Sequence, residues 1–274
     1  MIDVAGIAPP PTKAVQQWWV LTLRVIKPSF RNGEAFSQIA ASVLFICGFY
    51  IPLKEIMGGL SQGVSSYAQY LMPLVALQGA AFVAGISALR SATDARLGIN
   101  RRFKALPIGS LTPFAARMSA SVYRCGIALT VALIAGYIIG FRIYGGPSHA
   151  LGFCLMVLLI GAAFSFLGDF IGSATENPDQ VAPLILLPNV IFGLLSVGVQ
   201  PIDKFPDWIE PFVRNQPVSQ FVVALRALAG DKDGYPSAGE VEWSTVGPAF
   251  MWVIGLIVVL VPLHALIAKR RRDQ

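Results

Sequence analysis

Charged residues are scarce in this sequence. They make up 13% of the chain, whereas a soluble domain carries roughly 25%. Hydrophobic residues make up 55%, and apolar runs long enough to cross a bilayer recur along the 274 residues. These runs leave no room for a separate soluble catalytic domain. The sequence therefore predicts an all-α, polytopic membrane protein.

Catalytic and metal-binding motifs are absent. The sequence contains no G-x-x-x-x-G-K-S/T, no H-E-x-x-H and no G-x-S-x-G. The three cysteines lie in apolar runs without metal or disulfide spacing, and the two histidines are expected on opposite membrane faces. We therefore expect no enzyme activity, no metal and no cofactor on this chain. The net charge of +6 indicates an anionic membrane surface rather than nucleic acid.

The N-terminus divides into two parts. Residues 1–12 have no basic region followed by an apolar core, so they are not expected to be a signal peptide, and their three successive prolines predict disorder. Residues 13–27 have the pattern of an amphipathic helix lying in the membrane interface, which Pro28 is expected to end or kink. The residues that define this interface helix are Trp18, Trp19, Arg24 and Lys27.

Six apolar stretches are predicted to span the membrane. They cover about 36–53, 70–89, 118–141, 150–172, 183–199 and 245–268, with Pro188 and Gly193 interrupting the fifth. Small residues in the second span, such as Ala80 and Ala84, either permit close helix packing or reflect the general abundance of Gly and Ala in membrane helices. Counting Lys and Arg gives 14 on one side and 6 on the other, which places both termini in the cytoplasm.

The stretch Ser91–Pro107 is a basic interruption between two apolar blocks and is predicted to be the largest cytoplasmic loop. Two interpretations remain open, since its cations either set topology only or receive mechanical work from a partner. In the second interpretation an aliphatic face of Leu97, Ile99 and Phe103 matters more than any one charge at its rim.

Two ionisable residues, Arg124 and Asp169, fall inside predicted spans. Such residues are functional candidates by default, and Asp169 could couple transport to protons. Their opposite charges in the same half of the membrane favour a structural ion pair instead.

The external segment 200–230 is too apolar for a free loop, and Pro206, Pro211 and Pro217 divide it into short pieces. Two short helices that enter the outer leaflet would satisfy both features, provided that protein or water surrounds the breaks. An amphipathic helix on the surface is the alternative. The residues of interest are Trp208, Phe212, Arg214, Asn215, Gln216, Pro217, Gln220 and Arg226.

The order of these parts resembles the membrane subunits of type-2 ABC exporters, and more narrowly the daunorubicin-resistance-type permeases of actinobacteria (DrrB-like). The stretches that carry the resemblance include A-T-D-A-R-L-G-I-N-R-R-F at 92–103, Y-I-I-G-F-R at 137–142 and P-F-V-R-N-Q-P-V-S-Q-F-V-V-A-L-R-A-L-A-G-D at 211–231. Shorter ones are N-G-E at 32–34, G-F-Y-I-P at 48–52, L-T-P at 111–113 and F-G-L-L-S at 192–196.

The resemblance implies that residues 13–274 form a single ABC-2-type transmembrane domain in a multi-pass protein of the cell membrane. A separate ABC ATPase, expected in two copies, would bind ATP and Mg, and a second related permease would complete a heterodimer rather than a homodimer. Membrane lipids are the remaining partners. The contacts with the ATPase would come from Arg96, Leu97, Ile99, Asn100, Arg101, Arg102, Phe103 and Lys104.

The cargo implied by the resemblance is amphipathic, either a lipid like phthiocerol dimycocerosate or an anthracycline, carried out of the cytoplasmic leaflet. The spans lack the dense polar lining that a sugar or an inorganic ion would need. A membrane-embedded protein that modifies or assembles lipids without its own ATPase is the alternative function.

Overall fold

The computed structural model describes residues 14–58, 67–105, 108–109, 111–175, 177–230 and 241–270. Within these ranges the regular structure is helical and contains no strand, which confirms the all-α prediction. The elements are α1 (Ala14–Arg31), α2 (Glu34–Phe45), a π-helical turn (Ile46–Tyr50), α3 (Ile51–Gly58), α4 (Tyr67–Arg96), α5 (Ile99–Lys104), α6 (Thr112–Ile139), α7 (Pro147–Thr175), α8 (Pro178–Leu194), a 3-10 turn (Ile202–Lys204), α9 (Glu210–Asn215), α10 (Pro217–Ala229) and α11 (Trp243–Arg270). The predicted disorder of residues 1–12 lies outside the described ranges.

Five helical stretches of the described residues have the length and apolar composition of a membrane span. They are Phe36–Lys54, Tyr67–Arg96, Thr112–Ile139, Pro147–Thr175 and Trp243–His264. The predicted fifth span corresponds to α8, an apolar helix of 17 residues. At 1.5 Å per residue α8 is about 26 Å long, slightly less than the ~30 Å hydrocarbon core of a bilayer.

The spans are longer than predicted at the end where the chain becomes basic. Helix α4 continues to Arg96, and α6 begins at Thr112, so Arg90, Asp94 and Arg117 lie on helices rather than in the loop. Long cationic side chains can reach the interface from within a helix, so the first charge does not mark the end of a span. The first span was predicted to end at residue 53, whereas α3 continues the helical structure through Lys54 to Gly58.

Prolines inside two helices do not end them. Helix α8 continues through Pro183 and Pro188 and ends at Leu194, one residue after Gly193, so the predicted interruption at Pro188 is wrong. Helix α1 continues past Pro28 to Arg31, so Pro28 does not end it. A proline removes one backbone hydrogen bond, whereas the remaining backbone groups of an apolar helix have no better partner than each other. Helix α8 begins where the Asn177 side chain accepts a hydrogen bond from the backbone N–H of Asp179, at 3.1 Å.

Helix α4 is the centre of the bundle, and most of its residues between Ala68 and Ala92 are buried. Its closest neighbour is α7, where Gly168 and Gly172 lie directly on the backbone of Ala84 and Ala88. A Cβ atom at either glycine would collide with a carbonyl oxygen of α4. The close packing of α4 on α7 therefore depends on these two glycines of α7, and the role of the small residues in α4 stays a prediction.

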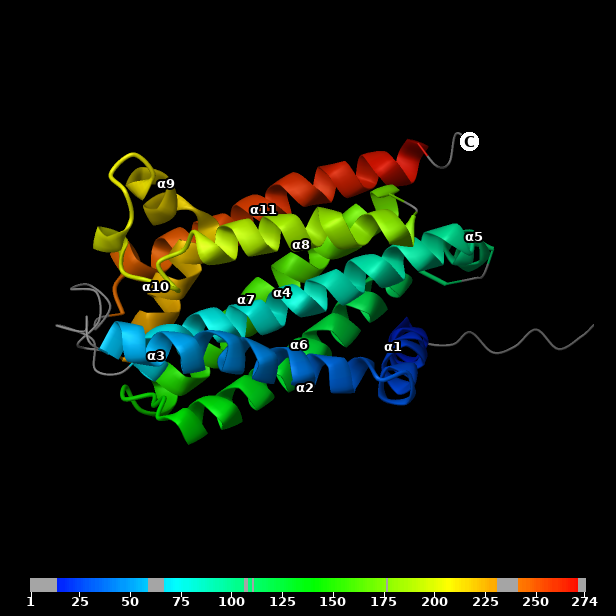
Figure 1. Cartoon of the computed structure of the whole chain (residues 1–274). Coiled ribbons are helices and arrows are strands. Elements are labelled where there is room, and N and C mark those ends of the chain that lie inside the picture. Colours follow the sequence, from blue (N-terminus) through cyan, green and yellow to red (C-terminus); the bar gives the residue numbers. More distant parts are fainter. Residues whose placement is uncertain are drawn as a thin grey trace, which may run out of the picture.

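The bundle has two distinct ends (Figure 1). Helix α1 lies across one end, where α5 and the C-terminal end of α11 also lie. Helices α3, α9 and α10 gather at the opposite end. We call these the α1/α5 end and the α9/α10 end.

Candidate functional site

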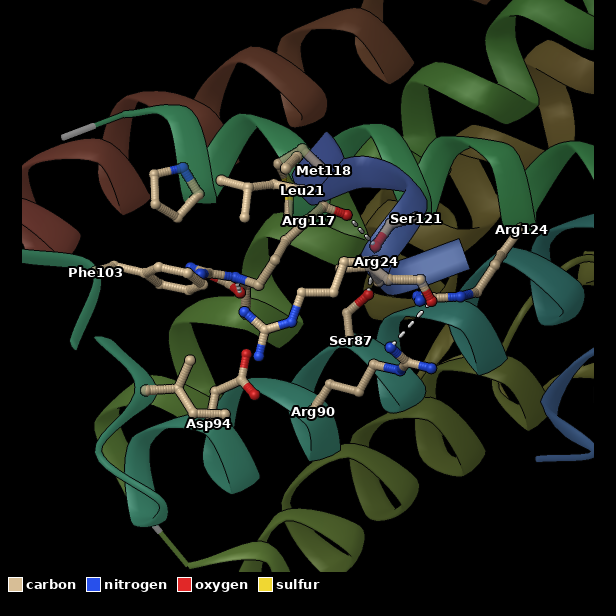
Figure 2. A pocket seen from close by; sticks show the side chains of 15 residues that line it. Leu21, Arg24, Ser87, Arg90, Asp94, Phe103, Arg117, Met118, Ser121 and Arg124 are labelled. Atoms are coloured by element: carbon tan, nitrogen blue, oxygen red, sulfur yellow. Dashed lines mark hydrogen bonds and ion pairs between the residues drawn. The ribbon is translucent and has the colours of Figure 1, made fainter. Parts of the chain in front are cut away.

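A pocket of about 120 Å³ opens at the α1/α5 end, where α1, α4, α5, α6 and α7 meet (Figure 2). Its lining is unusually polar for this apolar chain. The lining residues are Leu21, Arg24, Val25, Ser87, Arg90, Asp94, Ile99, Phe103, Pro113, Ala116, Arg117, Met118, Ser121, Arg124 and Asp169. The charged groups of three long helices and of α1 therefore converge on one space.

Arg117 of α6 and Asp169 of α7 form a forked ion pair at one wall of the pocket. The Nε of Arg117 donates to Oδ1 of Asp169 at 2.7 Å, and Nη2 donates to Oδ2 at 3.2 Å. The Asp169 side chain is only 1% exposed. Two parallel charge-assisted hydrogen bonds fix both the distance and the orientation of the two helices. Ser91 of α4 donates to the backbone carbonyl of Asp169 at 3.0 Å, which links a third helix to the pair.

A second ion-paired group is centred on Glu34, the first residue of α2. Its carboxylate accepts 2.6 Å hydrogen bonds from Arg90 of α4 and from the Ser29 hydroxyl of α1. The Nε of Arg124 on α6 lies 3.9 Å from Oε2 of Glu34 and donates to the Ser29 oxygen at 3.3 Å. Glu34 therefore joins four helices, and we call Glu34, Ser29, Arg90 and Arg124 the Glu34 clamp.

The pKa of the Glu34 carboxyl is shifted by opposing effects. Partial burial raises the pKa, but the hydrogen bonds from Arg90 and Ser29 and the charges of Arg90 and Arg124 outweigh it, so the pKa lies below the ordinary value of 4.5. The carboxylate is therefore ionised at neutral pH, and the clamp is complete under those conditions.

The predicted ion pair between Arg124 and Asp169 was wrong, because each residue has a different partner. Arg117 and Arg124 are seven residues apart on α6, which separates them by about 10 Å along the helix. One carboxylate cannot serve both positions. Asp169 lies level with Arg117, and Glu34 lies level with Arg124.

The residues predicted to contact a partner divide into two groups. Arg96, Leu97 and Arg102 are exposed, and Leu97 retains 60% of its accessible surface. Ile99 and Phe103 instead line the pocket, and the Phe103 ring lies 5.5 Å from the guanidinium of Arg24 on α1. Leu97 is exposed whereas Ile99 and Phe103 are half-buried, so the three do not form one uncovered face in this chain, and their contact with a partner stays a prediction. The side chains of Asn100, Arg101 and Lys104 lie outside the described part of the chain.

The turn between α4 and α5 explains why these neighbours face different ways. Gly98 adopts a left-handed conformation with φ of 66°. This conformation reverses the chain direction after Leu97 and is readily accessible to glycine. Leu97 consequently stays on the outer side while Ile99 enters the pocket. We call the exposed residues Arg96, Leu97 and Arg102 the α4–α5 patch.

The predicted interface helix is present as α1, which packs against α6. The Trp18 indole N–H donates to the Ser119 hydroxyl at 3.1 Å, so this tryptophan faces the bundle. Trp19 is 53% exposed, and Arg24 and Lys27 are also exposed. Helix α1 therefore presents an aromatic side chain and basic groups on its outer surface, the combination typical of a helix at a membrane interface.

The α9/α10 end contains the two short helices predicted for residues 200–230. Helix α9 ends at Asn215, whose side chain donates to the carbonyl of Pro211, and Arg214 pairs with Glu210. Pro217 is the first residue of α10. Trp208 is 80% exposed and Phe212 46%, so the outer side of this segment remains uncovered within the chain.

Two glutamine side chains form hydrogen bonds with backbone groups around the break between α9 and α10. Gln216 caps α10 through Val218 N–H and donates to the carbonyls of Phe192 and Leu195 at 3.0 Å. Gln220 donates to the Arg214 carbonyl at 2.7 Å. Side-chain amides thus satisfy backbone groups that an irregular segment would otherwise leave unpaired.

Arg226 of α10 is the largest side chain buried to below 2% exposure. It donates to the backbone carbonyls of Tyr70 on α4 and Val197 at 2.8–3.2 Å, and its guanidinium lies 3.6 Å from the Tyr70 ring centroid. No carboxylate lies within 4 Å of it among the described residues. Arg226 therefore ties α10 to the core helix through carbonyl dipoles and an aromatic face.

Sequence reasoning identified Arg226 as part of the external segment but missed its burial, and it missed Glu34, Ser29 and Arg117 as site residues. The sequence did contain a signal that Glu34 pairs with Arg90. Glu34 is an acid directly before one apolar run, and Arg90 directly follows the next apolar run. Two successive antiparallel spans bring such positions to the same end. No comparable signal pointed from Arg226 to backbone carbonyls.

Among the residues that the structure describes, no group of three or more His, Cys, Asp or Glu side chains gathers as a metal site. The charged clusters are arginine-rich ion pairs between helices. The fold and this site together define a multi-pass membrane protein whose helices are joined by ion pairs at one end and whose surface carries a basic patch between two spans.

Comparison with known proteins identifies the family to which this chain belongs. Residues 16–229 match the model of the ABC-2 type transporter family, so the chain belongs to that family. It is 46% identical over 261 residues to a doxorubicin resistance ABC transporter permease of Mycobacterium tuberculosis, with 93% of this chain and 90% of that protein covered.

Two further relatives are more distant. A probable doxorubicin resistance ABC transporter permease of the same organism, DrrC, is 28% identical over 84% of this chain and 81% of its own length. A daunorubicin resistance ABC transporter permease of Streptomyces coeruleorubidus is 25% identical over 82% of this chain and 77% of its own length. The resemblance to daunorubicin-resistance-type permeases is thus confirmed.

Proposed function

We propose that this chain is the permease subunit of an ATP-driven exporter and that it moves an amphipathic drug or a lipid out of the cytoplasmic leaflet. The observation that carries this proposal is the 46% identity, over almost the whole chain, to a permease named for doxorubicin resistance. An anthracycline and a lipid like phthiocerol dimycocerosate are the two cargo types. Both present a large apolar surface, which matches the apolar character of the spans.

The energy source in this proposal is a separate ABC ATPase, in two copies, that binds ATP and Mg. The sequence has no P-loop of its own, which supports a division of labour between chains. The α4–α5 patch is the proposed contact surface. Arg96, Leu97 and Arg102 are exposed together, and Gly98 allows the chain to turn sharply between them.

The transmission path in this proposal runs through α4. The patch lies at the end of α4, and Arg90 on the same helix belongs to the Glu34 clamp. A displacement of the patch would therefore reach α1, α2 and α6 through ion pairs rather than through a flexible loop. In this proposal both termini and the α1/α5 end lie on the cytoplasmic side, which the bias of Lys and Arg in the sequence supports.

The second partner is a related permease, in a heterodimer. Relatives with two different permease names in one organism support this choice over a homodimer. Part of the apolar outer surface would contact the second permease, and the rest would face lipid. On α8 alone, Leu184, Leu186 and Leu187 are 50–60% exposed.

The test is a pull-down of the tagged chain from its native membrane in a gentle detergent, followed by mass spectrometry. The proposal predicts an ABC ATPase and a second permease among the recovered proteins. An ATPase without a second permease would replace the heterodimer by a homodimer. Recovery of the chain with neither partner, under conditions that preserve other membrane complexes, would contradict the proposal.

A further inference from the structure

The pocket at the α1/α5 end has more positive than negative groups. Four arginines and two aspartates line it, which leaves two positive charges in excess. Glu34 lies outside the lining but binds Arg90, and counting it still leaves one positive charge without a counterpart. An uncompensated charge at the edge of an apolar bundle is unfavourable unless an anion accompanies it.

The surplus charge is localised at Arg124. This residue lines the pocket and is 2% exposed. Its Nε donates to the Ser29 hydroxyl, but its Nη2 is buried without a hydrogen-bond partner. Its nearest carboxylate oxygen, Oε2 of Glu34, lies 3.9 Å from Nε and is already held by Arg90 and Ser29. A buried guanidinium with an unused donor is rare and indicates a missing acceptor.

The pocket is large enough for a polyatomic anion and reaches the surface. Its volume is about 120 Å³, whereas one water needs only about 10–15 Å³ of such space. Arg24, which contributes to the α1 wall, is exposed, so a group can approach between α1 and α5. Figure 2 shows the head groups of Arg90 and Arg124 on one side of this space, while Arg24 extends from α1 across it toward Asp94.

We propose that this pocket binds a phosphate group, carried by an anionic membrane lipid or free in solution. Guanidinium groups present paired N–H donors that match the oxygens of a phosphate. Basic pockets between membrane helices on the cytoplasmic side are typical headgroup sites, because the phosphates of a bilayer lie at that depth. The amphipathic helix α1 forms one wall, which places the pocket beside the membrane surface.

The proposed role is to stabilise the junction of α1 with α4 and α6. A phosphate that accepts from Arg124 and Arg24 would join α6 to α1 in addition to the Glu34 clamp. The proposal concerns the isolated chain and does not depend on transport or on an ATPase. Its failure would leave the proposed permease function unaffected, and the converse also holds.

Asp94 allows a test of whether the pocket binds a negatively charged group. It lines the pocket, and no hydrogen bond or ion pair within 4 Å joins it to another residue in the part that the structure describes. Its carboxylate would repel a bound phosphate. Removing a positive charge and removing this negative charge must therefore change phosphate binding in opposite directions.

The experiment uses the full-length chain in a neutral detergent. Native mass spectrometry measures retention of phosphatidylglycerol and of phosphatidylcholine, and calorimetry with inorganic phosphate forms a second arm. The wild type is expected to retain phosphatidylglycerol in preference to phosphatidylcholine. Arg24→Gln and Arg124→Gln should each weaken binding about tenfold, the loss of one charge-assisted contact. Asp94→Asn should strengthen it, and Arg24→Lys should retain part of it.

The matched control is Arg31→Gln. Arg31 lies two turns after Arg24 on the same side of α1, is exposed, and does not line the pocket. It removes the same charge from the same helix. Arg24 is exposed, so its variant reports on binding even where Arg124→Gln fails to fold.

The results of the binding experiment either support the phosphate site or overturn it. Retention of phosphatidylglycerol that depends on Arg24 and rises with Asp94→Asn identifies a lipid source, and the same pattern with inorganic phosphate identifies the free anion. Both support a phosphate site. Equal retention in all four charge variants, or binding of neither ligand by the wild type, overturns the proposal.

Discussion

Both ends of the bundle hold arginine side chains beside an apolar core, and the two ends stabilise these charges with different partners. At the α1/α5 end, arginines pair with Glu34 and Asp169, and the paired residues come from α2, α4, α6 and α7. At the α9/α10 end, Arg226 has carbonyl and aromatic partners and no carboxylate among the described residues. Ion pairs between side chains can exchange partners, whereas the carbonyls that hold Arg226 belong to the backbone of α4 and of the turn that follows α8. The comparison indicates that the α1/α5 end can rearrange and that the α9/α10 end is fixed.

Asp169→Asn tests the ion-paired end most severely. It leaves the Arg117 guanidinium, whose side chain is 16% exposed, without its counter-charge, and loss of one partner of a buried pair costs about 3–5 kcal/mol. Thermal unfolding of the purified chain should show the largest drop for this variant. The double variant with Arg117→Gln should recover part of the loss, because it removes the unpaired charge. A single variant as stable as the wild type would contradict the structural role and leave proton coupling through Asp169 open.

Gly172→Ala tests the helix contact that holds this end in register. The added Cβ would collide with the carbonyl oxygen of Ala88, which is backbone and cannot rotate away. Overpacking of this kind costs about 1–3 kcal/mol. Gly126→Ala on α6 is the matched control, since nothing lies within 4 Å of its added Cβ. Equal unfolding temperatures for the two variants would show that α4 and α7 are not in such close contact.

Arg226→Met tests the fixed end. It preserves much of the side-chain volume but removes the guanidinium hydrogen bonds to the carbonyls of Tyr70 and Val197, of which the Val197 carbonyl keeps the Tyr70 hydroxyl as a donor. Hydrogen bonds from a charged group contribute about 1.5–3 kcal/mol, so a loss of about 2 kcal/mol is expected. Arg214→Met should change stability by less than about 0.5 kcal/mol, because its pair with Glu210 is exposed. Proteolysis within α9 and α10 should increase for Arg226→Met alone.

Glu34→Gln should have the smallest effect and a defined pH dependence. The folded-state pKa of Glu34 lies below its ordinary value of 4.5, so its contribution is present above that pH and is lost as the pH falls through the folded pKa. At pH 7 the variant should lose about 1 kcal/mol of stability. The difference between wild type and variant should shrink below pH 4.5. A difference that grew on acidification would contradict the sign of this shift.

Much of the architecture was predictable because backbone groups inside a lipid bilayer must form hydrogen bonds with each other. Apolar runs of bilayer length become helices, and the predicted interface helix and the short helices of 200–230 follow from periodicity and proline spacing. Helix ends were less predictable, since Arg90 and Arg117 extend helices into the basic region rather than ending them.

The site was predictable in composition but not in pairing. The sequence marked Arg124 and Asp169 as buried ions, yet the rise of α6 between Arg117 and Arg124 decides which carboxylate each can reach. Likewise, the apolar character of Leu97 and Phe103 gave no indication that the left-handed Gly98 would turn them to different sides. Such choices depend on the helical register between segments that are distant in sequence.

The measurement that tests the central claim most directly compares the two ends in the native membrane. A photoactivatable cross-linking residue replaces Leu97 in one variant and Trp208 in another, since both side chains are exposed and they lie at opposite ends. The account predicts a cross-link to an ABC ATPase from position 97 and none from position 208. An ATPase cross-linked from position 208, or from neither position while the complex still co-purifies, would contradict the assignment of the α1/α5 end as the side that receives work.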